Sequence, residues 1–262
     1  MNKSYTLLFI AIAALTGCQK ADEHLDEQFL KAKQLKSAKP NEIKDCRILQ
    51  ISYPLGNTND VIQFTYNSFG DPVSVTRLLG THTGHPNFIF KYDQQNRLTE
   101  FIGYYNNSVF AEFWHKYFYD KQDNIILDSG YIFPRVVNGF PENAHIQQLT
   151  YYTYDNKQRI IKDSTVFSTS TLASVHTYTY DANGNKTGFV YDDQINLNRT
   201  NKIWMFINRD YSVNNPFNAD SYNLIGLPTS LNLPSHERLF GFLGTSLSQA
   251  QINYECKAKL AR

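Results

Sequence analysis

A tyrosine-centred pattern recurs five times along this chain and constrains its fold more than any other feature of the sequence. The tyrosines that anchor the pattern are Tyr66, Tyr92, Tyr119, Tyr154 and Tyr180, at spacings of 26, 27, 35 and 26 residues. A nearly fixed period of this size indicates a repeated supersecondary unit. The sequence therefore says more about the fold of the chain than about its activity.

Each copy of the pattern predicts a β-hairpin. An aromatic residue stands two positions before every anchor tyrosine, and residues two apart in a strand share one face of the sheet. The residue after the tyrosine is Asp or Asn, whose side chain accepts a backbone hydrogen bond and so begins a turn. The fourth position after the tyrosine suits a positive φ in four copies, where it is Gly70, Asn96, Asp123 or Gly184, whereas Gln158 departs from this preference.

The N-terminus predicts a lipoprotein. Residues 1–17 hold one basic residue, Lys3, before a short apolar run that ends Leu15-Thr16-Gly17-Cys18. The run is too short to span a bilayer and fits a secretory signal peptide. Its end is similar to the lipobox, so Cys18 is the predicted lipidation site and new N-terminus, with palmitate among its acyl chains. The following residues 19–23 resemble the acidic tag that sends Bacteroidota lipoproteins to the outer face of the outer membrane; a plain solvated tether is the alternative.

The best copy of the repeat, Tyr180-Asp181-Ala182-Asn183-Gly184-Asn185, resembles the YD repeat of the RHS family at every position. The other copies match it in part. From about Cys46 onward the chain also resembles a family of Bacteroidota lipoproteins of unknown function, whose domain is described as a porin-like, barrel-shaped β-sheet. The resemblance implies a fold and brings no activity or catalytic residues. The chain is too short to form the hollow shell in which RHS proteins hold a toxic cargo.

Three segments follow from the composition along the chain. Residues 1–17 form the signal peptide, residues 18–42 a lipidated tether whose apolar spacing fits a short helix, and residues 43–262 a single β-meander domain. Residues 208–235 break the repeat with three prolines and predict an irregular insertion, with a strand before it at 202–207. The 25 basic and 24 acidic residues leave almost no net charge, which argues against a nucleic-acid partner.

The sequence favours a non-enzymatic protein without cofactors. It lacks Gly-x-Ser-x-Gly, His-Glu-x-x-His and the phosphate-binding Gly-x-x-x-x-Gly-Lys-Ser/Thr loop. His82 and His85 stand three apart in a predicted loop without the further ligands that zinc requires, so we expect no metal site. His115 and His176 fall in aromatic strands and are expected to be cross-strand packing partners.

The 18 Tyr, 18 Phe and 2 Trp residues make the chain unusually aromatic. Aromatic rings on a curved sheet can stack against sugars or apolar ligands, and Trp114 and Trp204 are the candidate platforms. The alternative, which the strand periodicity favours, is that the rings fill the interior of the domain. Ser164, in Asp163-Ser164-Thr165, is a candidate acceptor because this triplet resembles the O-glycosylation motif of Bacteroidota.

Cys46 and Cys256 are a candidate disulfide, since they lie in the first and last predicted strands and the Cα atoms of a bridge must approach within about 7 Å. In a closed sheet these strands are neighbours, whereas in an open meander they are opposite edges. Two unpaired, buried thiols are the alternative.

The predicted fold is all-β: an antiparallel meander of about a dozen strands, forming a strongly curved sheet or a closed barrel. We expect an outer-membrane lipoprotein that faces the cell exterior and binds a glycan, a peptide or an envelope protein. The alternatives are an accessory envelope lipoprotein without a ligand and an enzyme with an unfamiliar site. A concave aromatic pocket would favour the first, a filled interior the second, and converging buried carboxylates or histidines the third.

Overall fold

The computed structural model describes residues 46–142, 145–170, 172–233 and 241–257. The predicted lipidation site Cys18, the acidic tag and the tether lie outside the described residues. In chain order the first twelve strands are β1 (Cys46–Leu55), β2 (Thr58–Tyr66), β3 (Pro72–Arg77), β4 (Asn87–Tyr92), β5 (Leu98–Tyr104), β6 (Ala111–Tyr119), β7 (Ile125–Ile132), β8 (Arg135–Val137), β9 (Phe140–Glu142), β10 (Gln148–Tyr154), β11 (Ile160–Phe167) and β12 (Ala173–Thr177). They are followed by η1 (Leu197–Thr200), α2 (Lys202–Ile207), β13 (Ser221–Tyr222), β14 (Pro228–Asn232), β15 (Gly241–Phe242), β16 (Thr245–Ser246) and β17 (Gln249–Cys256).

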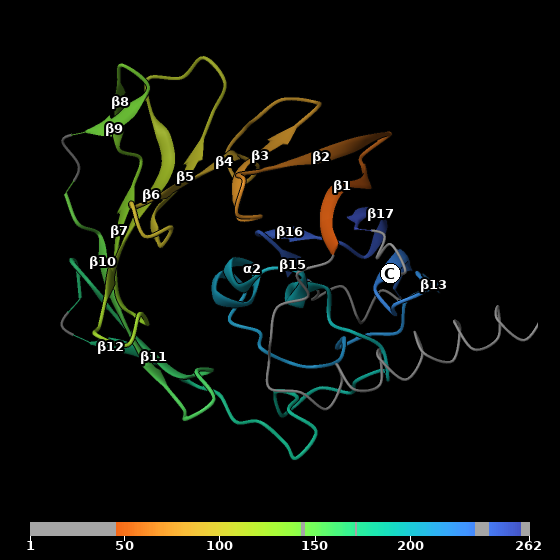
Figure 1. Ribbon diagram of the computed structural model, residues 1–262. Helices are drawn as coiled ribbons and strands as arrows, with labels where there is room; N and C mark the ends of the chain where they lie inside the picture. Colours follow the sequence, from red (N-terminus) through yellow and green to blue (C-terminus); the bar gives the residue numbers. More distant parts are fainter. Residues whose placement is uncertain (1–45, 143–144, 171, 234–240, 258–262) are drawn as a thin grey trace, which may run out of the picture.

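Thirteen of these strands form one antiparallel sheet in the order β12-β11-β10-β7-β6-β5-β4-β3-β2-β1-β17-β14-β13. Figure 1 shows that the sheet curves strongly and that α2 lies inside the curve. Its two edges, β12 and β13, do not pair with each other, so the sheet is open. The predicted all-β antiparallel meander is confirmed. Of the two predicted forms, the structure has the strongly curved sheet and not the closed barrel.

Cys46 and Cys256 face each other across β1 and β17 and form a disulfide, with Cα atoms 4.0 Å apart. The sequence argument that tied this bridge to a closed sheet is wrong. The chain returns after the insertion and adds β17 beside β1, with β14 and β13 beyond it. The first strand is therefore an interior strand, and the two cysteines meet in an open sheet.

The turn of each repeat is built by the acidic or amide residue after the anchor tyrosine. In the fourth copy the Asp155 carboxylate accepts hydrogen bonds from the backbone N–H groups of Lys157 and Arg159, both at 2.9 Å. All five residues at the fourth position have a positive φ, including Gln158 at 61°. The repeat thus imposes the left-handed conformation even on the copy whose side chain disfavours it.

The hydroxyl of each anchor tyrosine ties its hairpin to the preceding one. The acceptor is a backbone carbonyl six residues after the previous anchor tyrosine, in the pairs Tyr92–Pro72 (2.6 Å), Tyr119–Leu98 (2.8 Å), Tyr154–Ile125 (2.8 Å) and Tyr180–Ile160 (3.1 Å). A tyrosine can make this bond because its rigid ring carries the hydroxyl away from its own strand. The repeated tyrosines therefore form a ladder that crosses the sheet.

A sixth copy of the repeat, which the sequence analysis missed, begins at Tyr222. The Asn223 side chain accepts from the backbone N–H of Leu227 at 2.9 Å, and Gly226 at the fourth position has φ 86°. The hydroxyl of Tyr254 donates at 2.7 Å to the carbonyl of Pro228, which again lies six residues after the anchor. The stretch 208–235 is accordingly not irregular throughout: its second half supplies β13 and β14 to the sheet.

The inner face of the sheet is lined by the aromatic residues that precede the anchor tyrosines, and α2 packs on them. The edge-on ring contacts, with centroids 5.3–5.7 Å apart, are Phe64–Trp204, Phe90–Trp204, Tyr117–Phe206 and Tyr152–Phe206. These rings belong to the main hydrophobic core. The aromatic excess of the sequence is therefore largely a packing feature of the sheet and its insertion.

Residues 202–207 form α2 and not the predicted strand. Asn201 caps the helix, because its side chain accepts from the backbone N–H of Ile203 at 2.8 Å while its amide donates at 3.1 Å to the carbonyl of Gly70. The apolar sequence reads as a strand, but it packs against the aromatic row on the concave face and has no strand partner there. A helix of six residues is too short to be stable alone, so this packing holds it.

A candidate ligand pocket inside the curve of the sheet

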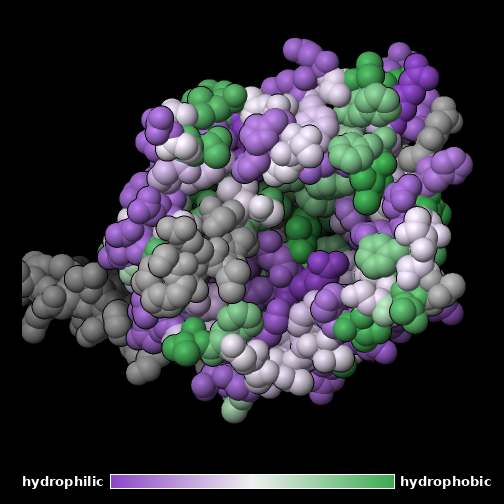
Figure 2. Space-filling view, turned by 180° about the vertical axis from the view of Figure 1, so that it is seen from behind, coloured by the Kyte–Doolittle hydropathy of each residue, from purple (hydrophilic) through white to green (hydrophobic). Residues whose placement is uncertain are grey.

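A cavity of about 250 Å³ lies between the inner face of the sheet and the C-terminal end of α2. Its lining includes residues of β4, β5, β6, β7 and β10, the end of α2, and the β15–β16 turn. Viewed from behind, the molecule is hollowed inside the curve of the sheet, and hydrophobic and hydrophilic side chains lie side by side there (Figure 2). Inside the curve, α2 fills only part of the concave side.

One wall of the pocket is aromatic. The rings of Phe88 and Phe101 are stacked at 5.4 Å between centroids, and Phe113 lies 4.9 Å from Phe101. Gly103 sets the position of Phe113, since a Cβ at Gly103 would come within 2.6 Å of that ring. The glycine in β5 therefore lets the Phe113 ring lie against the strand backbone, where it is tilted by 56° against the Phe101 ring and completes an apolar wall of the cavity.

The opposite part of the pocket is polar and begins with a paired histidine. His115 Nδ1 lies 2.8 Å from Asp128 Oδ1, and the Asp128 side chain is buried. The hydroxyl of Tyr152 donates to the same carboxylate at 3.4 Å. Because a carboxylate accepts hydrogen bonds, Nδ1 carries the proton and Nε2 of a neutral His115 is an acceptor.

A second pair lies on the next strands. Asp163 on β11 accepts from His176 Nδ1 at 2.9 Å and from the Tyr178 hydroxyl at 2.5 Å. Arg209 connects the two pairs: its Nε lies 3.2 Å from Asp163, and its Nη2 donates at 3.2 Å to Tyr152. Burial alone would lower the pKa of the Arg209 guanidinium, but Tyr152 and Asp163 raise it, so Arg209 stays charged. Burial raises the pKa of Tyr152, which keeps this hydroxyl protonated.

Two residues at the rim of the pocket have a left-handed backbone that favours glycine. Arg209 has φ 48° directly after α2, and Leu243 has φ 51° in the β15–β16 turn. The backbone N–H of Arg209 donates to the carbonyl of Phe206, as in a helix end that usually carries glycine. Such a residue costs about 1 kcal/mol or more, and such conformations cluster at functional sites. From this position the Arg209 side chain reaches Asp163 and Tyr152.

The tryptophan and glycosylation candidates predicted from the sequence do not line this pocket. Trp204 is fully buried in the core, so the prediction that it stacks on a ligand is wrong. Trp114 lies on the outer face, where its ring is 4.9 Å from Tyr131 and its N–H donates to Glu100. Ser164 also points outward, between two strands of that face, because Asp163 and Thr165 on either side point inward and are buried. Neither Trp114 nor Ser164 borders the pocket.

The sequence analysis missed His115, Asp128, Asp163 and Arg209 as members of one site. His115 was interpreted as a packing partner and Asp163 as part of a glycosylation motif, and Asp128 was not singled out. A signal was present: in both pairs the histidine and the aspartate are 13 residues apart. That separation brings two residues of adjacent antiparallel strands together across a long hairpin. Arg209 gave no signal, because its position depends on the helix that the sequence did not predict.

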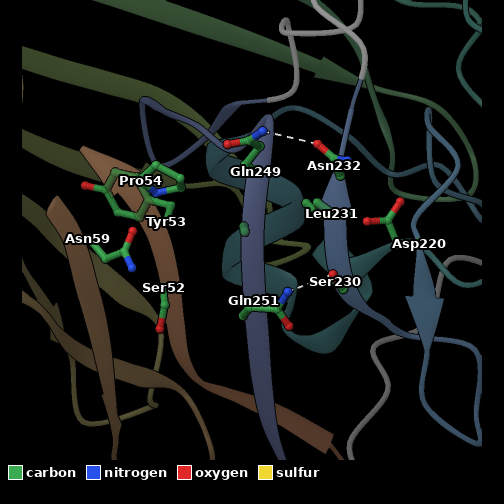
Figure 3. Close-up of a pocket in the computed structure, with 11 residues that line it drawn as sticks. Ser52, Tyr53, Pro54, Asn59, Asp220, Ser230, Leu231, Asn232, Gln249 and Gln251 are labelled. Atoms are coloured by element: carbon green, nitrogen blue, oxygen red, sulfur yellow. Dashed lines mark hydrogen bonds between the residues drawn. The ribbon is translucent and has the colours of Figure 1, made fainter. Parts of the chain in front are cut away.

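A second hollow, of about 350 Å³, lies beside β1, β17 and β14 (Figure 3). Gln249 donates to Asn232 at 3.2 Å and Gln251 donates to Ser230 at 2.8 Å, as the dashed lines show. The polar side chains in this hollow therefore satisfy one another. The pocket inside the curve has the stronger case as a binding site, since its histidine and arginine keep hydrogen-bonding capacity.

Metal or nucleophile chemistry finds little support in the residues that the structure describes. They contain no group of three or more His, Cys, Asp or Glu residues placed to hold a metal ion. His82 and His85 lie 4.5 Å apart between ring centroids but form only such a pair. The pocket lining within the described ranges has no Ser, Thr, Cys or Lys beside His115. No helix in the described part of the chain is long and apolar enough to cross a membrane.

Comparison with known proteins gives weak structural neighbours only. No family model matches the sequence, and no curated protein matches it. Among solved structures, the crystal structure of TcdB2-TccC3-Cdc42 is 20% identical over 52% of this chain, and that of TcdB2-TccC3-TEV is 12% identical over 70%. Both have a TM-score of 0.29, and this chain covers 7% and 9% of theirs. The neighbours are toxin-complex chains with RHS/YD repeats.

Proposed function

We propose that this protein is a non-enzymatic, lipid-anchored module of the outer membrane that binds a ligand from the cell exterior in the pocket inside the curve of its sheet. The observation that carries the proposal is Arg209. It is held in a left-handed backbone at the rim of an aromatic-walled cavity and connects two buried aspartates. Glycine would adopt this backbone without strain but could reach neither Asp163 nor Tyr152.

The two alternatives each have an observation in their favour. The packing of α2 on the aromatic row suits an accessory protein whose interior is filled, but the cavity beyond the helix remains open. The His115–Asp128 pair suits a general base, as in an enzyme with an unfamiliar site. The described lining has no Ser, Thr, Cys or Lys beside His115, and its Asp128 and Tyr152 are held in hydrogen bonds, so we place binding above catalysis.

The binding proposal is tested with a glycan array and a peptide array, probed with the full chain carrying Cys18→Ser. Phe113→Ala removes part of the aromatic wall, and Phe118→Ala is its matched control, because Phe118 lies on the same strand and is exposed on the outer face. We expect ligand signals that Phe113→Ala loses and Phe118→Ala retains. Absence of any signal for the wild-type sequence, or equal signals for the two variants, would overturn the proposal.

The proposed lipid anchor and location on the cell surface follow from Cys18 and residues 19–23. Palmitate labelling of the protein is expected in the wild type and not in Cys18→Ser, and protease added to intact cells is expected to degrade the wild type. Labelling that persists in Cys18→Ser would contradict the anchor. Full protection in intact cells, with digestion after lysis, would place the protein in the periplasm.

An O-glycan on Ser164 belongs to the same proposal. An intact mass equal to that of the lipidated chain alone would contradict this glycan.

A further inference from the structure

The geometry of the pocket points to its ligand class: we propose that it binds one neutral sugar ring, of the pyranose kind, at the end of a glycan. This inference rests on the proposed function, since it concerns the same pocket. Its three supports are the aromatic wall, the combination of acceptor and donor groups opposite that wall, and the partners that the charged groups already have within the protein.

The aromatic wall suits the apolar face of a sugar. Phe101 and Phe113 present rings 4.9 Å apart, and Gly103 lets the Phe113 ring lie against the sheet. The C–H groups on one face of a pyranose can stack on such rings, as other apolar ligand faces do. A cavity of about 250 Å³ is below the usual size of a drug-sized ligand site, so it suits a single ring rather than a chain.

The polar side of the pocket offers an acceptor and a donor together. Asp128 holds Nδ1–H of His115, which leaves Nε2 as an acceptor, and the His115 side chain is 20% exposed and thus accessible. Arg209 has five N–H donors, and among the described residues its Nη1 has no acceptor. A pair of neighbouring hydroxyl groups can donate to His115 and accept from Arg209. A carboxylate cannot donate, and an ammonium group cannot accept.

The charged groups of the pocket already have partners within the protein. Arg209 lies against Asp163, and Asp128 accepts hydrogen bonds from the Nδ1–H group of a neutral His115 and from the Tyr152 hydroxyl. Arg209 has its counter-ion in Asp163 and the Asp128 carboxylate is buried under its donors, so a charged ligand would lose hydration without forming a new ion pair. A neutral hydroxylated ring meets the same groups without that cost, so the pocket selects neutral sugars over their acidic and amino forms.

The test measures binding of individual sugars to the full chain carrying Cys18→Ser, by saturation-transfer NMR and calorimetry. The probes are the methyl glycosides of glucose, galactose, mannose and N-acetylglucosamine. Glucuronic acid, glucosamine and the apolar dye N-phenylnaphthylamine serve as comparison ligands. We expect at least one neutral glycoside to bind about tenfold more tightly than its charged forms, which corresponds to about 1.4 kcal/mol.

Two pocket variants and one control complete the test. Arg209→Gln and His115→Gln should each weaken glycoside binding by about tenfold or more, because each removes one hydrogen bond to a sugar hydroxyl. Trp114→Ala, on the outer face, should leave binding unchanged. His115→Gln remains informative if Arg209→Gln fails to fold.

The outcomes separate the sugar inference from the proposed function. If a charged sugar or the dye binds better than every neutral glycoside and His115→Gln or Phe113→Ala reduces that binding, the pocket is a binding site and the sugar inference is wrong. If glycosides bind equally to all variants, the site lies elsewhere and both proposals fail. If no probe binds the wild-type sequence, the sugar inference is likewise overturned.

Discussion

The repeated hairpins and the segment between the fifth and sixth copies, residues 186–219, hold their backbones in different ways. In the hairpins, each turn is built by residues within five positions of one another, and each tyrosine hydroxyl reaches only the preceding copy. In the segment, asparagine side chains form hydrogen bonds with backbone groups that are farther away along the chain. Asn215 accepts from the N–H of Leu197, 18 residues away, and Asn201 donates to the carbonyl of Gly70. The repeats supply a curved surface, and the segment supplies the helix and arginine that turn this surface into a pocket.

The repeats thus build the regular sheet, and the segment builds the part of the candidate pocket that the repeats alone do not provide. Each of the first five copies of the repeat places an aromatic residue on the concave face, and these residues alone would form a continuous apolar groove. The segment covers part of the groove with Trp204 and Phe206 and leaves the remainder open beside Arg209. Changes in the repeats should therefore alter stability, and changes at the border between the regions should alter binding.

The largest expected effect comes from breaking the disulfide that joins the first strand of the sheet, β1, to the last strand of the chain, β17. Cys256→Ser removes the disulfide to Cys46, which spans 210 residues. The chain-entropy model gives a loss of roughly 5 kcal/mol in the free energy of unfolding for a loop of this length. Guanidinium unfolding with and without reductant measures it. The denatured, unreduced full chain with Cys18→Ser should show no free thiol, and two free thiols would contradict the bridge.

The next effect concerns the packing of the segment on the repeats. Trp204→Ala should reduce the free energy of unfolding by about 3–5 kcal/mol, because a fully buried indole that contacts Phe64, Phe90 and Phe242 is removed and a cavity remains. Trp114→Ala is the control, since Trp114 is only partly buried on the outer face, and it should cost much less. Equal losses for the two variants would show that α2 does not stabilise the concave face.

How much of this could be predicted differs between the regions for a physical reason. The hairpins were predictable because turn chemistry, strand periodicity and the tyrosine spacing are all local, and together they specify an antiparallel meander. Gly226 and Tyr222 were missed as a sixth copy because Asp220 replaces the aromatic residue two positions before the anchor. The helix α2, which was predicted as a strand, shows the limit of apolar patterning, since a short buried helix and a buried strand have the same composition.

The pocket was predictable only in part. The aromatic wall follows from the repeat, and the sequence analysis anticipated rings on a curved sheet. The position of Arg209 does not follow, because it depends on where a six-residue helix ends against a sheet far away in the sequence. The openness of the sheet was also undetermined, since nothing local shows whether β17 pairs with β1 as an interior strand or as a closing edge.

A smaller effect tests the turn of the fifth copy, which borders the segment. Gly184 has φ 87°, and a Cβ there would lie 3.0 Å from Val213 of the segment. Gly184→Val should lower the free energy of unfolding by about 2 kcal/mol, because a β-branched residue is strained at positive φ. Gln158→Val should cost less, since Gln158 already bears strain at φ 61°. Equal melting temperatures would contradict this turn assignment.

The tyrosine ladder should contribute about 1 kcal/mol per hydroxyl, the usual net value of one hydrogen bond. Tyr154→Phe removes the bond to the carbonyl of Ile125 and leaves the ring in place. Tyr151→Phe is the matched control on the same strand, because Tyr151 is 49% exposed and points outward. Urea unfolding of both variants gives the difference. Equal stabilities would mean that the ladder orders the hairpins without stabilising them.

The smallest expected effect is a gain. Gln158 is the only anchor-turn residue other than Gly, Asn or Asp, yet it adopts φ 61°. Gln158→Gly removes a left-handed strain of about 1–2 kcal/mol and adds about 0.5–1 kcal/mol of backbone entropy to the unfolded chain. The difference predicts a stabilisation of about 0.5–1 kcal/mol, measured as a rise in the urea midpoint at unchanged slope. Gly70→Gln, the reverse change in the first copy at φ 88°, should destabilise by a similar amount. If Gln158→Gly destabilises the protein instead, the turn of the fourth copy is held by the glutamine side chain and the repeats are less equivalent than their backbones indicate.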